Sequence, residues 1–298
     1  MERRQPFAAI DLALLLMIVL WAANISIIKA SLSQLAPMAF NALRFGAASL
    51  ITLFLTRGIE HDVSIPRKSW GWVAILGFVG HFCYQALFIN GLARTTASNS
   101  ALLLSTAPIF VALISTANGS ERLAGWNWLG ILLSFAGIGL LITGSGSRIT
   151  LASKTLAGDL MTLSAAMCWA VNTSYSRRLI QQTSALRTTT WTMLVATPLM
   201  ALAALPELRA QDWRAVTASA WMGLAYSSIF AIALGYVIWN TGVQRLGGAR
   251  TSTYQYLTPL ISVVLAWTFL GENLRPLQVI GAVGILAGVA LGRYRRLR

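Results

Sequence analysis

The chain has 298 residues, of which 56% are hydrophobic and only 11% are charged, and its mean hydropathy is +0.65. Soluble globular domains carry about a quarter of their residues as charged side chains, so this composition excludes a disordered chain, a disulfide scaffold and an ordinary soluble enzyme. The formal net charge of +14 would fit a nucleic-acid-binding protein, but so apolar a chain points first to lipid as its solvent.

Ten apolar segments follow one another along the chain, each close to the roughly 20 residues that a helix needs to cross a bilayer. The connections between them are too short for a soluble domain of about 100 residues. The sequence therefore predicts an all-α integral membrane protein with ten transmembrane helices. The segments are residues 9–29, 37–56, 70–91, 97–117, 124–143, 156–176, 187–205, 218–240, 248–269 and 276–292.

The first segment follows Arg3 and Arg4, which is one feature of a signal peptide. It is longer than the usual apolar region of such a peptide and no clear cleavage site follows it, so we interpret it as the first transmembrane helix. Cys83 and Cys168 both lie inside apolar segments without a CxxC spacing. That placement favours small core residues over a disulfide or a metal site.

Lys and Arg are divided unequally between the two sets of alternate loops. Fifteen of the 23 fall on the side that holds both termini, seven fall on the opposite side, and Arg44 lies within a segment. Because cytoplasmic loops carry the Lys/Arg excess, both termini are predicted to be cytoplasmic, which requires an even number of spans. No loop is large enough to form a basic face for nucleic acid, so no such partner is expected.

The sequence also repeats itself. Residues 11–26 align with residues 159–174 at an offset of 148, which pairs Trp21 with Trp169 and Asn24 with Asn172. Further along the chain the offset becomes 151 residues, after a slip of three. So many coincidences at two fixed offsets indicate a duplication. At the later offset of 151 the pairs are Trp70/Trp221, Gly91/Gly242, Arg94/Arg245, Pro108/Pro259, Glu121/Glu272, Leu123/Leu274, Gly130/Gly281 and Gly137/Gly288.

The duplication predicts two units, residues 7–144 and 155–294, of five helices each. An odd number of spans means that the second unit enters the membrane from the opposite side, which makes the two units inverted repeats. Such repeats recur in secondary transporters, where the substrate site lies near the midplane between them and access alternates.

Several motifs resemble the EamA units of the drug/metabolite transporter superfamily. Both halves share a W-A-x-N-x-S start, a proline within the fourth segment, and a Glu-containing turn before a glycine-rich last helix. The first half adds Arg44-Phe45 and a G-L-x-x-T-x-A stretch at residues 91–97, whereas the second half has Thr192 near the position of Arg44. The whole chain is most similar to exporters of aromatic and neutral amino acids of the YddG type. The resemblance implies an inner-membrane exporter of small metabolites.

Polar residues inside spans are costly and usually face a cavity or another helix. Amides and hydroxyls can bind the carboxylate and amine of a zwitterion while aromatic rings receive its side chain. The alternative is that the polar groups bond helix to helix. The candidate substrate-binding residues are Trp21, Asn24, His81, Tyr84, Gln85, Asn99, Trp169, Asn172, Tyr254, Gln255 and Thr258.

The ionisable residues within the segments have competing interpretations. His81 either carries a proton or, as we favour, stays neutral in a hydrogen bond. Asp11 and Asp159 are expected to interact with helix dipoles rather than to couple protons. Arg44 is expected to snorkel or to pair with a carboxylate. Glu121 and Glu272 are expected to cap the last helix of each half.

Pro108 and Pro259 predict matched kinks, because each removes a hydrogen bond in mid-segment. Gly284, Gly288 and Gly292 predict a face for close packing, either within the monomer or between monomers. The oligomeric state is left open, and a monomer is compatible with every feature.

The sequence contains no GxxxxGK[ST], HExxH or CxxC motif, so we expect no cofactor, no metal and no direct use of ATP. We predict a non-enzymatic secondary transporter in the bacterial inner membrane that exports small amphipathic metabolites, with aromatic or neutral amino acids favoured. The alternatives are a transporter of other metabolites or drugs, a multi-span enzyme and a channel. The enzyme would need a His/Asp/Glu cluster at one membrane face, and the channel a ring of like charges or a filter loop.

Overall fold

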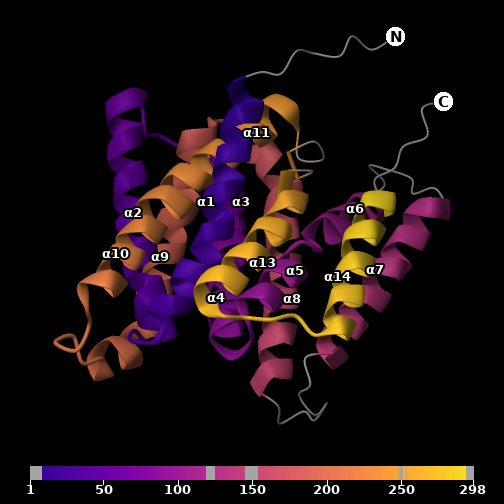
Figure 1. The fold of residues 1–298 in the computed structure, drawn as a ribbon. Coiled ribbons are helices and arrows are strands. Elements are labelled where there is room, and N and C mark those ends of the chain that lie inside the picture. Colours follow the sequence, from indigo (N-terminus) through magenta and orange to yellow (C-terminus); the bar gives the residue numbers. More distant parts are fainter. Residues whose placement is uncertain (1–8, 119–124, 145–153, 248–250, 253, 293–298) are drawn as a thin grey trace.

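The computed structural model describes residues 9–118, 125–144, 154–247, 251–252 and 254–292, and every regular element in these ranges is helical (Figure 1). The elements of the first half are α1 (Ala9–Ser31), α2 (Pro37–Ile59), η1 (Arg67–Ser69), α3 (Trp70–Ile75), η2 (Leu76–Cys83), α4 (Tyr84–Arg94), α5 (Ala97–Leu104), α6 (Ala107–Ala117) and α7 (Gly125–Gly144). Those of the second half are α8 (Lys154–Ile180), α9 (Ala185–Ala210), α10 (Ala218–Tyr226), η3 (Ser227–Leu234), α11 (Gly235–Leu246), η4 (Tyr254–Tyr256), α13 (Leu257–Leu270) and α14 (Pro276–Gly292).

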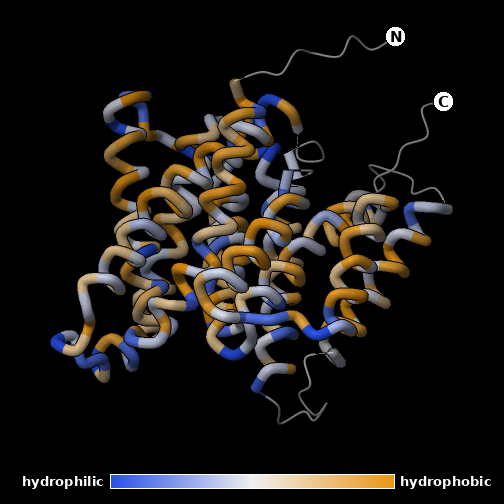
Figure 2. Tube along the Cα trace, viewed as in Figure 1, coloured by the Kyte–Doolittle hydropathy of each residue, from blue (hydrophilic) through white to orange (hydrophobic). Residues whose placement is uncertain are grey.

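The side chains are distributed as contact with lipid requires. Large apolar side chains such as Leu202 and Met222 face outward, whereas Asn41 and Thr189 are fully buried. Figure 2 shows hydrophobic residues along the helices and hydrophilic ones concentrated near their ends. Six described helices or helical runs are long and apolar enough to cross a membrane: Ala9–Ser31, Pro37–Ile59, Arg67–Arg94, Ala97–Ile114, Ala185–Ala210 and Ala218–Leu246. Shorter apolar helices cover Gly125–Leu141, Leu257–Leu270 and Pro276–Gly288.

The two halves repeat the same irregular features. The π-helices η2 and η3 begin at Leu76 and Ser227, which are 151 residues apart, the same offset as in the sequence repeat. The fourth run is interrupted in both halves, between α5 and α6 and again before α13. Pro108 and Pro259 lie in the first turns of α6 and α13, where a missing N–H costs little. The predicted mid-helix kinks are therefore helix starts that follow an interruption.

Equivalent helices of the two halves pack against each other in opposite directions. Along α2 and α9, the Asn41 amide lies 3.0 Å from Met200 Sδ, and the Thr56 and Thr190 hydroxyls lie 2.7 Å apart. Because the numbering rises along α2 as it falls along α9, the two helices are antiparallel. This opposite direction is what an inverted repeat requires, in which an approximate two-fold axis crosses the helices.

The last helices, α7 and α14, form a second antiparallel pair, and glycines bring their backbones together. A Cβ atom at Gly137 would lie 2.6 Å from the backbone nitrogen of Ile285, and one at Gly288 would lie 2.5 Å from the carbonyl oxygen of Gly130. Gly284 also lies against Gly137. The glycine face predicted on the last helix therefore packs within the monomer.

The carboxylate of Glu272 caps a different helix from the one expected. It lies in the loop before α14 and accepts hydrogen bonds from the backbone N–H groups of Ala97 (2.8 Å) and Ser98 (3.0 Å), at the start of α5. The prediction that it caps the last helix is wrong, because the loop turns its carboxylate toward the neighbouring half. Glu121 lies outside the described residues, as do several basic residues used in the charge count: Arg3, Arg4, Arg122, Arg148, Arg250, Arg293, Arg295, Arg296 and Arg298.

Contacts between loops show which loops lie at the same end of the molecule. At one end the Ser184 hydroxyl donates to the carboxylate of Glu60 at 2.7 Å, so the loop after α2 lies beside the loop before α9. At the other end the Gln211 side-chain amide donates to the carbonyl oxygen of Gln34 at 3.0 Å, so the loop after α1 lies beside the loop after α9. Each contact joins loops that the basic-residue pattern assigns to the same side.

Candidate functional site

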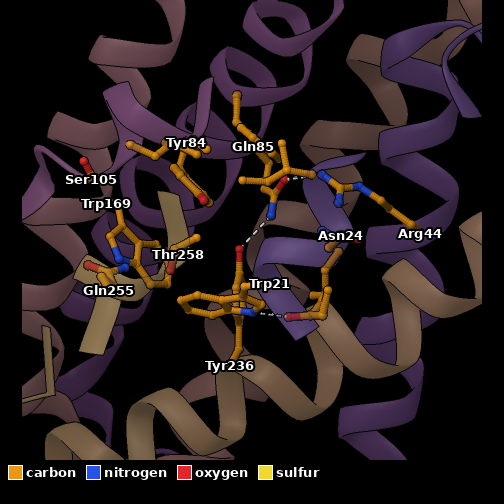
Figure 3. Close-up of a pocket in the computed structure, with 16 residues that line it drawn as sticks. Trp21, Asn24, Arg44, Tyr84, Gln85, Ser105, Trp169, Tyr236, Gln255 and Thr258 are labelled. Atoms are coloured by element: carbon orange, nitrogen blue, oxygen red, sulfur yellow. Dashed lines mark hydrogen bonds between the residues drawn. The ribbon is translucent and has the colours of Figure 1, made fainter. Parts of the chain in front are cut away.

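A cavity lies between the two halves, about midway along α1 (Figure 3). It encloses about 650 Å³ of space between atoms, counting the space at its opening. Its lining consists of Trp21, Asn24, Ile25, Arg44, Tyr84, Gln85, Phe88, Ala101, Leu104, Ser105, Trp169, Ala231, Ile232, Tyr236, Gln255 and Thr258.

Four aromatic rings form an apolar part of the wall. The centroid of the Trp169 ring lies 5.6 Å from that of Trp21, 5.0 Å from Tyr84 and 5.5 Å from Tyr236. The Trp21 indole is fixed because its Nε1–H donates to the carbonyl oxygen of Ala231, in η3, at 2.7 Å. Rings arranged edge to face or at a tilt provide a surface on which an apolar or aromatic group can pack.

Equivalent residues of the two halves meet at the cavity, as residues on an approximate two-fold axis would. Trp21 and Trp169 occupy equivalent positions at an offset of 148, and their rings are in contact. Gln85 and Tyr236 are 151 residues apart, and the Gln85 side-chain amide donates to the Tyr236 hydroxyl at 2.6 Å. Figure 3 shows this hydrogen bond crossing from one half to the other.

Arg44 supplies a buried charge to the wall. Its side chain is only 1% exposed and donates to Asn41 Oδ1 (3.0 Å), Ser227 Oγ (2.9 Å) and Gln85 Oε1 (2.6 Å). The guanidinium also lies 5.5 Å from the centre of the Phe40 ring. The expectation that Arg44 snorkels or pairs with a carboxylate is therefore wrong, because α4 and η3 enclose it with neutral hydrogen-bond acceptors.

Interrupted helices contribute the rest of the polar lining. Gln255 lies in η4 and Thr258 in the first turn of α13, while Ser105 lies in the equivalent interruption between α5 and α6. In inverted-repeat transporters, helices broken near the midplane commonly present polar groups to the solute. Both halves therefore bring the same kind of irregular segment to the cavity.

Three polar atoms of the cavity residues are buried and have no hydrogen-bond partner among the described residues. They are Asn24 Oδ1, Trp169 Nε1 and Thr258 Oγ1. A buried polar group without a partner costs about 1–3 kcal/mol, so such groups need an explanation. A solute bound in the cavity is one source of such partners.

Two other predicted residues, His81 and Asn172, lie close to the cavity but do not line it. His81 Nε2 lies 3.0 Å from the Thr192 hydroxyl, and both side chains are fully buried. Asn172 packs against the backbone of Gly80, where a Cβ atom would lie 2.6 Å from Asn172 Oδ1. These contacts join η2 to α9 and to α8, in keeping with the role of polar groups in helix association.

Asn99 and Tyr254, also predicted as site residues, bind buried carboxylates instead. The Asn99 amide lies 3.3 Å from Asp159, which also accepts a 2.5 Å hydrogen bond from the Thr95 hydroxyl. Tyr254 donates its hydroxyl proton to Asp11. Asp11 lies in the first turn of α1, as the dipole interpretation requires, but Asp159 lies beyond the first turn of α8. Its dipole assignment is therefore wrong, and its contacts are with Thr95, at the end of α4, and with Asn99 in α5.

The lining contains three polar residues that sequence reasoning did not place there. Tyr236 had a usable signal, because it lies 151 residues after Gln85 and so occupies the equivalent position. Ser105 lies three residues before Pro108, where an interruption of the helix can be expected. Arg44 follows Asn41 by three residues on one helical face, which indicated one neutral partner but not the other two.

A model of the EamA-like transporter family matches the chain twice, over residues 8–143 and 156–293. The chain belongs to the EamA-like transporter family. The protein is therefore a multi-pass membrane transporter rather than an enzyme, and the family expected from the sequence motifs is confirmed. The two matched ranges show that the duplicated unit is the family's own domain.

Relatives with similar sequences include several transporters. The chain is 30% identical to an uncharacterized transporter, YyaM, of Bacillus subtilis, with 90% of this chain and 88% of the relative covered. It is 26% identical to a "Probable amino-acid metabolite efflux pump" of Salmonella typhimurium, with 99% and 96% covered. A "Probable terminal-alkyne amino-acid exporter" of Streptantibioticus cattleyicolor is 27% identical, with 96% and 93% covered. Among the solved structures that match in fold is a crystal structure with a TM-score of 0.68, 20% identity and 96% of each chain covered.

Proposed function

We propose that this transporter is a secondary exporter of small amphipathic metabolites, with aromatic or neutral amino acids, the solutes of YddG-type exporters, as the favoured class. The observation that carries the proposal is the combination of an aromatic wall with three buried, unpartnered polar atoms in one cavity. Rings would receive an apolar side chain, while Asn24 Oδ1 would accept a hydrogen bond from an ammonium group. The names of two relatives, an amino-acid metabolite efflux pump and an amino-acid exporter, support this class.

Alternating access is the mechanism that the repeat supports. The cavity lies on the approximate axis between the halves, so rocking one half against the other would open it to either side in turn. We also propose ten membrane spans, with units at residues 7–144 and 155–294 and both termini in the cytoplasm. The uneven distribution of basic residues between alternate loops supports that orientation.

Transport by the purified protein in liposomes tests the proposal. We expect saturable, stereoselective counterflow of labelled L-phenylalanine or L-leucine, without added ATP. A panel of other metabolites and drugs, run in parallel, tests the alternative substrate classes. If no amino acid moves faster than in protein-free liposomes, the proposed substrate class is wrong.

A matched pair of tryptophan variants tests the position of the site. Trp169→Ala removes the ring at the centre of the aromatic wall, and we expect the half-saturation concentration to rise about tenfold or more, because one ring pair is worth about 0.5–1.5 kcal/mol beyond its buried area. Trp128→Ala removes an outward-facing ring of α7 that does not line the cavity, so transport should stay unchanged. Equal effects of the two substitutions would remove the cavity from the transport path.

A further inference from the structure

Arg44 carries a positive charge for which the described residues offer no counter-charge. All three of its hydrogen-bond acceptors are neutral: two side-chain amides and a hydroxyl. In the described part of the chain Arg44 takes part in no salt bridge. A buried cation with only neutral partners pays most of its desolvation penalty without compensation, so its retention in the wall of a cavity needs a reason.

The described acidic side chains are all engaged elsewhere. Asp11 accepts from Tyr254, Asp159 from Thr95, Glu207 from the backbone of Met38, and Glu272 from that of Ala97. Glu60 and Asp62 pair with Arg187, and Asp212 accepts from the backbone N–H of Arg214. A described carboxylate could reach Arg44 only if its side chain gave up an existing contact.

The guanidinium has unused hydrogen-bonding capacity. It has five N–H donors in a planar fork, and three of them make the hydrogen bonds to Asn41, Ser227 and Gln85. Figure 3 shows the group pointing from α2 toward Gln85 at the cavity wall. Arg44 itself belongs to the lining, and two N–H donors of its guanidinium make no hydrogen bond among the described residues.

We propose that Arg44 is the carboxylate-binding residue of this transporter, and that its substrates must therefore carry a free carboxylate. The inference rests on the proposed function and names the group that the site selects. An arginine fork binds a carboxylate through short, charge-assisted hydrogen bonds, and the bound anion would supply the missing counter-charge. Phe40 and Phe88, whose ring centres lie 5.5 Å and 5.9 Å from the guanidinium, hold it in place.

A purely structural role for Arg44 predicts a different pattern of ligand effects. Its hydrogen bonds tie α2 to α4 and to η3, so loss of the side chain could weaken the packing of the site as a whole. In that case every ligand would be affected alike. A carboxylate-binding role affects only ligands that have a carboxylate.

The experiment measures binding of three matched probes to the full-length protein in detergent: L-phenylalanine, 3-phenylpropionate, which lacks the amine, and phenethylamine, which lacks the carboxylate. For Arg44→Gln we expect the dissociation constants of both carboxylates to rise about 10- to 100-fold, as follows from the loss of a hydrogen bond between charged groups. The dissociation constant of phenethylamine should not rise. Arg44→Lys keeps the charge and should retain a preference for the carboxylates. Arg187→Gln, which removes an arginine outside the cavity, is the matched control.

Several outcomes would overturn the inference. It is wrong if Arg44→Gln weakens all three probes equally, if it weakens none, or if the unmodified protein binds phenethylamine as tightly as L-phenylalanine. Each of these is compatible with amino-acid counterflow in liposomes, so the proposed function would stand. The converse result, in which carboxylate binding depends on Arg44 but no amino acid is transported, would refute the proposed function and keep the carboxylate site.

Discussion

Single buried polar side chains link the two halves of this molecule through hydrogen bonds. Asp159 in α8 is fully buried and accepts hydrogen bonds from Thr95 at 2.5 Å and Asn99 at 3.3 Å. The carbonyl oxygen of the Asn99 side chain accepts in turn from Gln278 in α14, at 2.9 Å. One carboxylate thereby connects a helix of the second half to the interrupted fourth run of the first half.

Two substitutions of Asp159 separate its charge from its hydrogen-bonding role. Asp159→Ala leaves the Thr95 hydroxyl and the Asn99 amide without their acceptor, so we expect the free energy of unfolding to fall by about 1–3 kcal/mol. Asp159→Asn keeps a carbonyl acceptor and should destabilise less. The midpoint of thermal unfolding in detergent measures both. Equal losses in the two variants would show that the charge, not the hydrogen bonds, matters here, because both substitutions remove the charge.

Sequence reasoning placed seven of the residues that line the cavity, because polar and aromatic side chains at span centres usually face a cavity or another helix. Trp21 and Trp169 were also recognisable as a repeated pair. Sequence reasoning did not predict the surroundings of Arg44. A charge inside a membrane usually snorkels or forms an ion pair, and Arg44 does neither among the described residues. Its neutral partners Gln85 and Ser227 lie 41 and 183 residues away, and no local pattern reports such contacts.

Close helix packing in this transporter depends on glycine at particular positions of α7. Gly137 faces α14, where a Cβ atom would meet backbone atoms of Ile285 and Gly281 at 2.6 and 2.7 Å. Gly139, two residues later on the same helix, has nothing within 4 Å of the equivalent Cβ position. The two glycines therefore differ in packing while sharing a helix and a membrane environment.

This difference predicts opposite effects of the same substitution. Gly137→Ala must push two backbones apart, and we expect a loss of about 1–3 kcal/mol in unfolding free energy, the usual cost of overpacking. Gly139→Ala meets no neighbour and should be neutral or stabilising by up to about 1 kcal/mol, because alanine is the better helix former. Thermal unfolding of the two variants side by side measures the contrast. Equal destabilisation would mean that α7 and α14 do not pack as described.

The helices themselves were largely predictable, whereas their interruptions were not. Apolar runs of about 20 residues indicate helices in lipid, and the described helices follow the predicted segments closely. Pro108 correctly marked an irregular position, but only tertiary structure shows that α5 ends at Leu104 and a new helix follows. The π-helices at Leu76–Cys83 and Ser227–Leu234 have no sequence signal of their own, since they depend on how neighbouring helices pack.

The approximate two-fold axis accounts for the position of the site in the whole molecule. Residues on such an axis meet their own equivalents, as Gln85 meets Tyr236 and Trp21 meets Trp169. In the alternating access that we propose, rocking of one half against the other would move these pairs least and the two ends of the molecule most. A solute bound at the axis would therefore keep its contacts while the openings at the two ends alternate, which is what export through one site requires.

The same arrangement predicts which loops face the cytoplasm. The loop that contains Ser64 lies at the end with Arg57, Arg67 and Lys68, and the positive-inside rule places it in the cytoplasm. The loop that contains Ala215 lies at the opposite end of α9 and should face outward. Ser64 and Ala215 are both exposed, so a cysteine at either position would be accessible from its own side.

Cysteine labelling in intact cells tests this orientation. In a background with Cys83→Ser and Cys168→Ser, a membrane-impermeant maleimide should label Ala215→Cys without lysis and Ser64→Cys only after lysis. The two variants are controls for each other, because each must become labelled once both membrane faces are open. Labelling of Ser64→Cys in intact cells, with Ala215→Cys protected, would invert the topology, and labelling of both would contradict the odd number of spans that we propose between these loops.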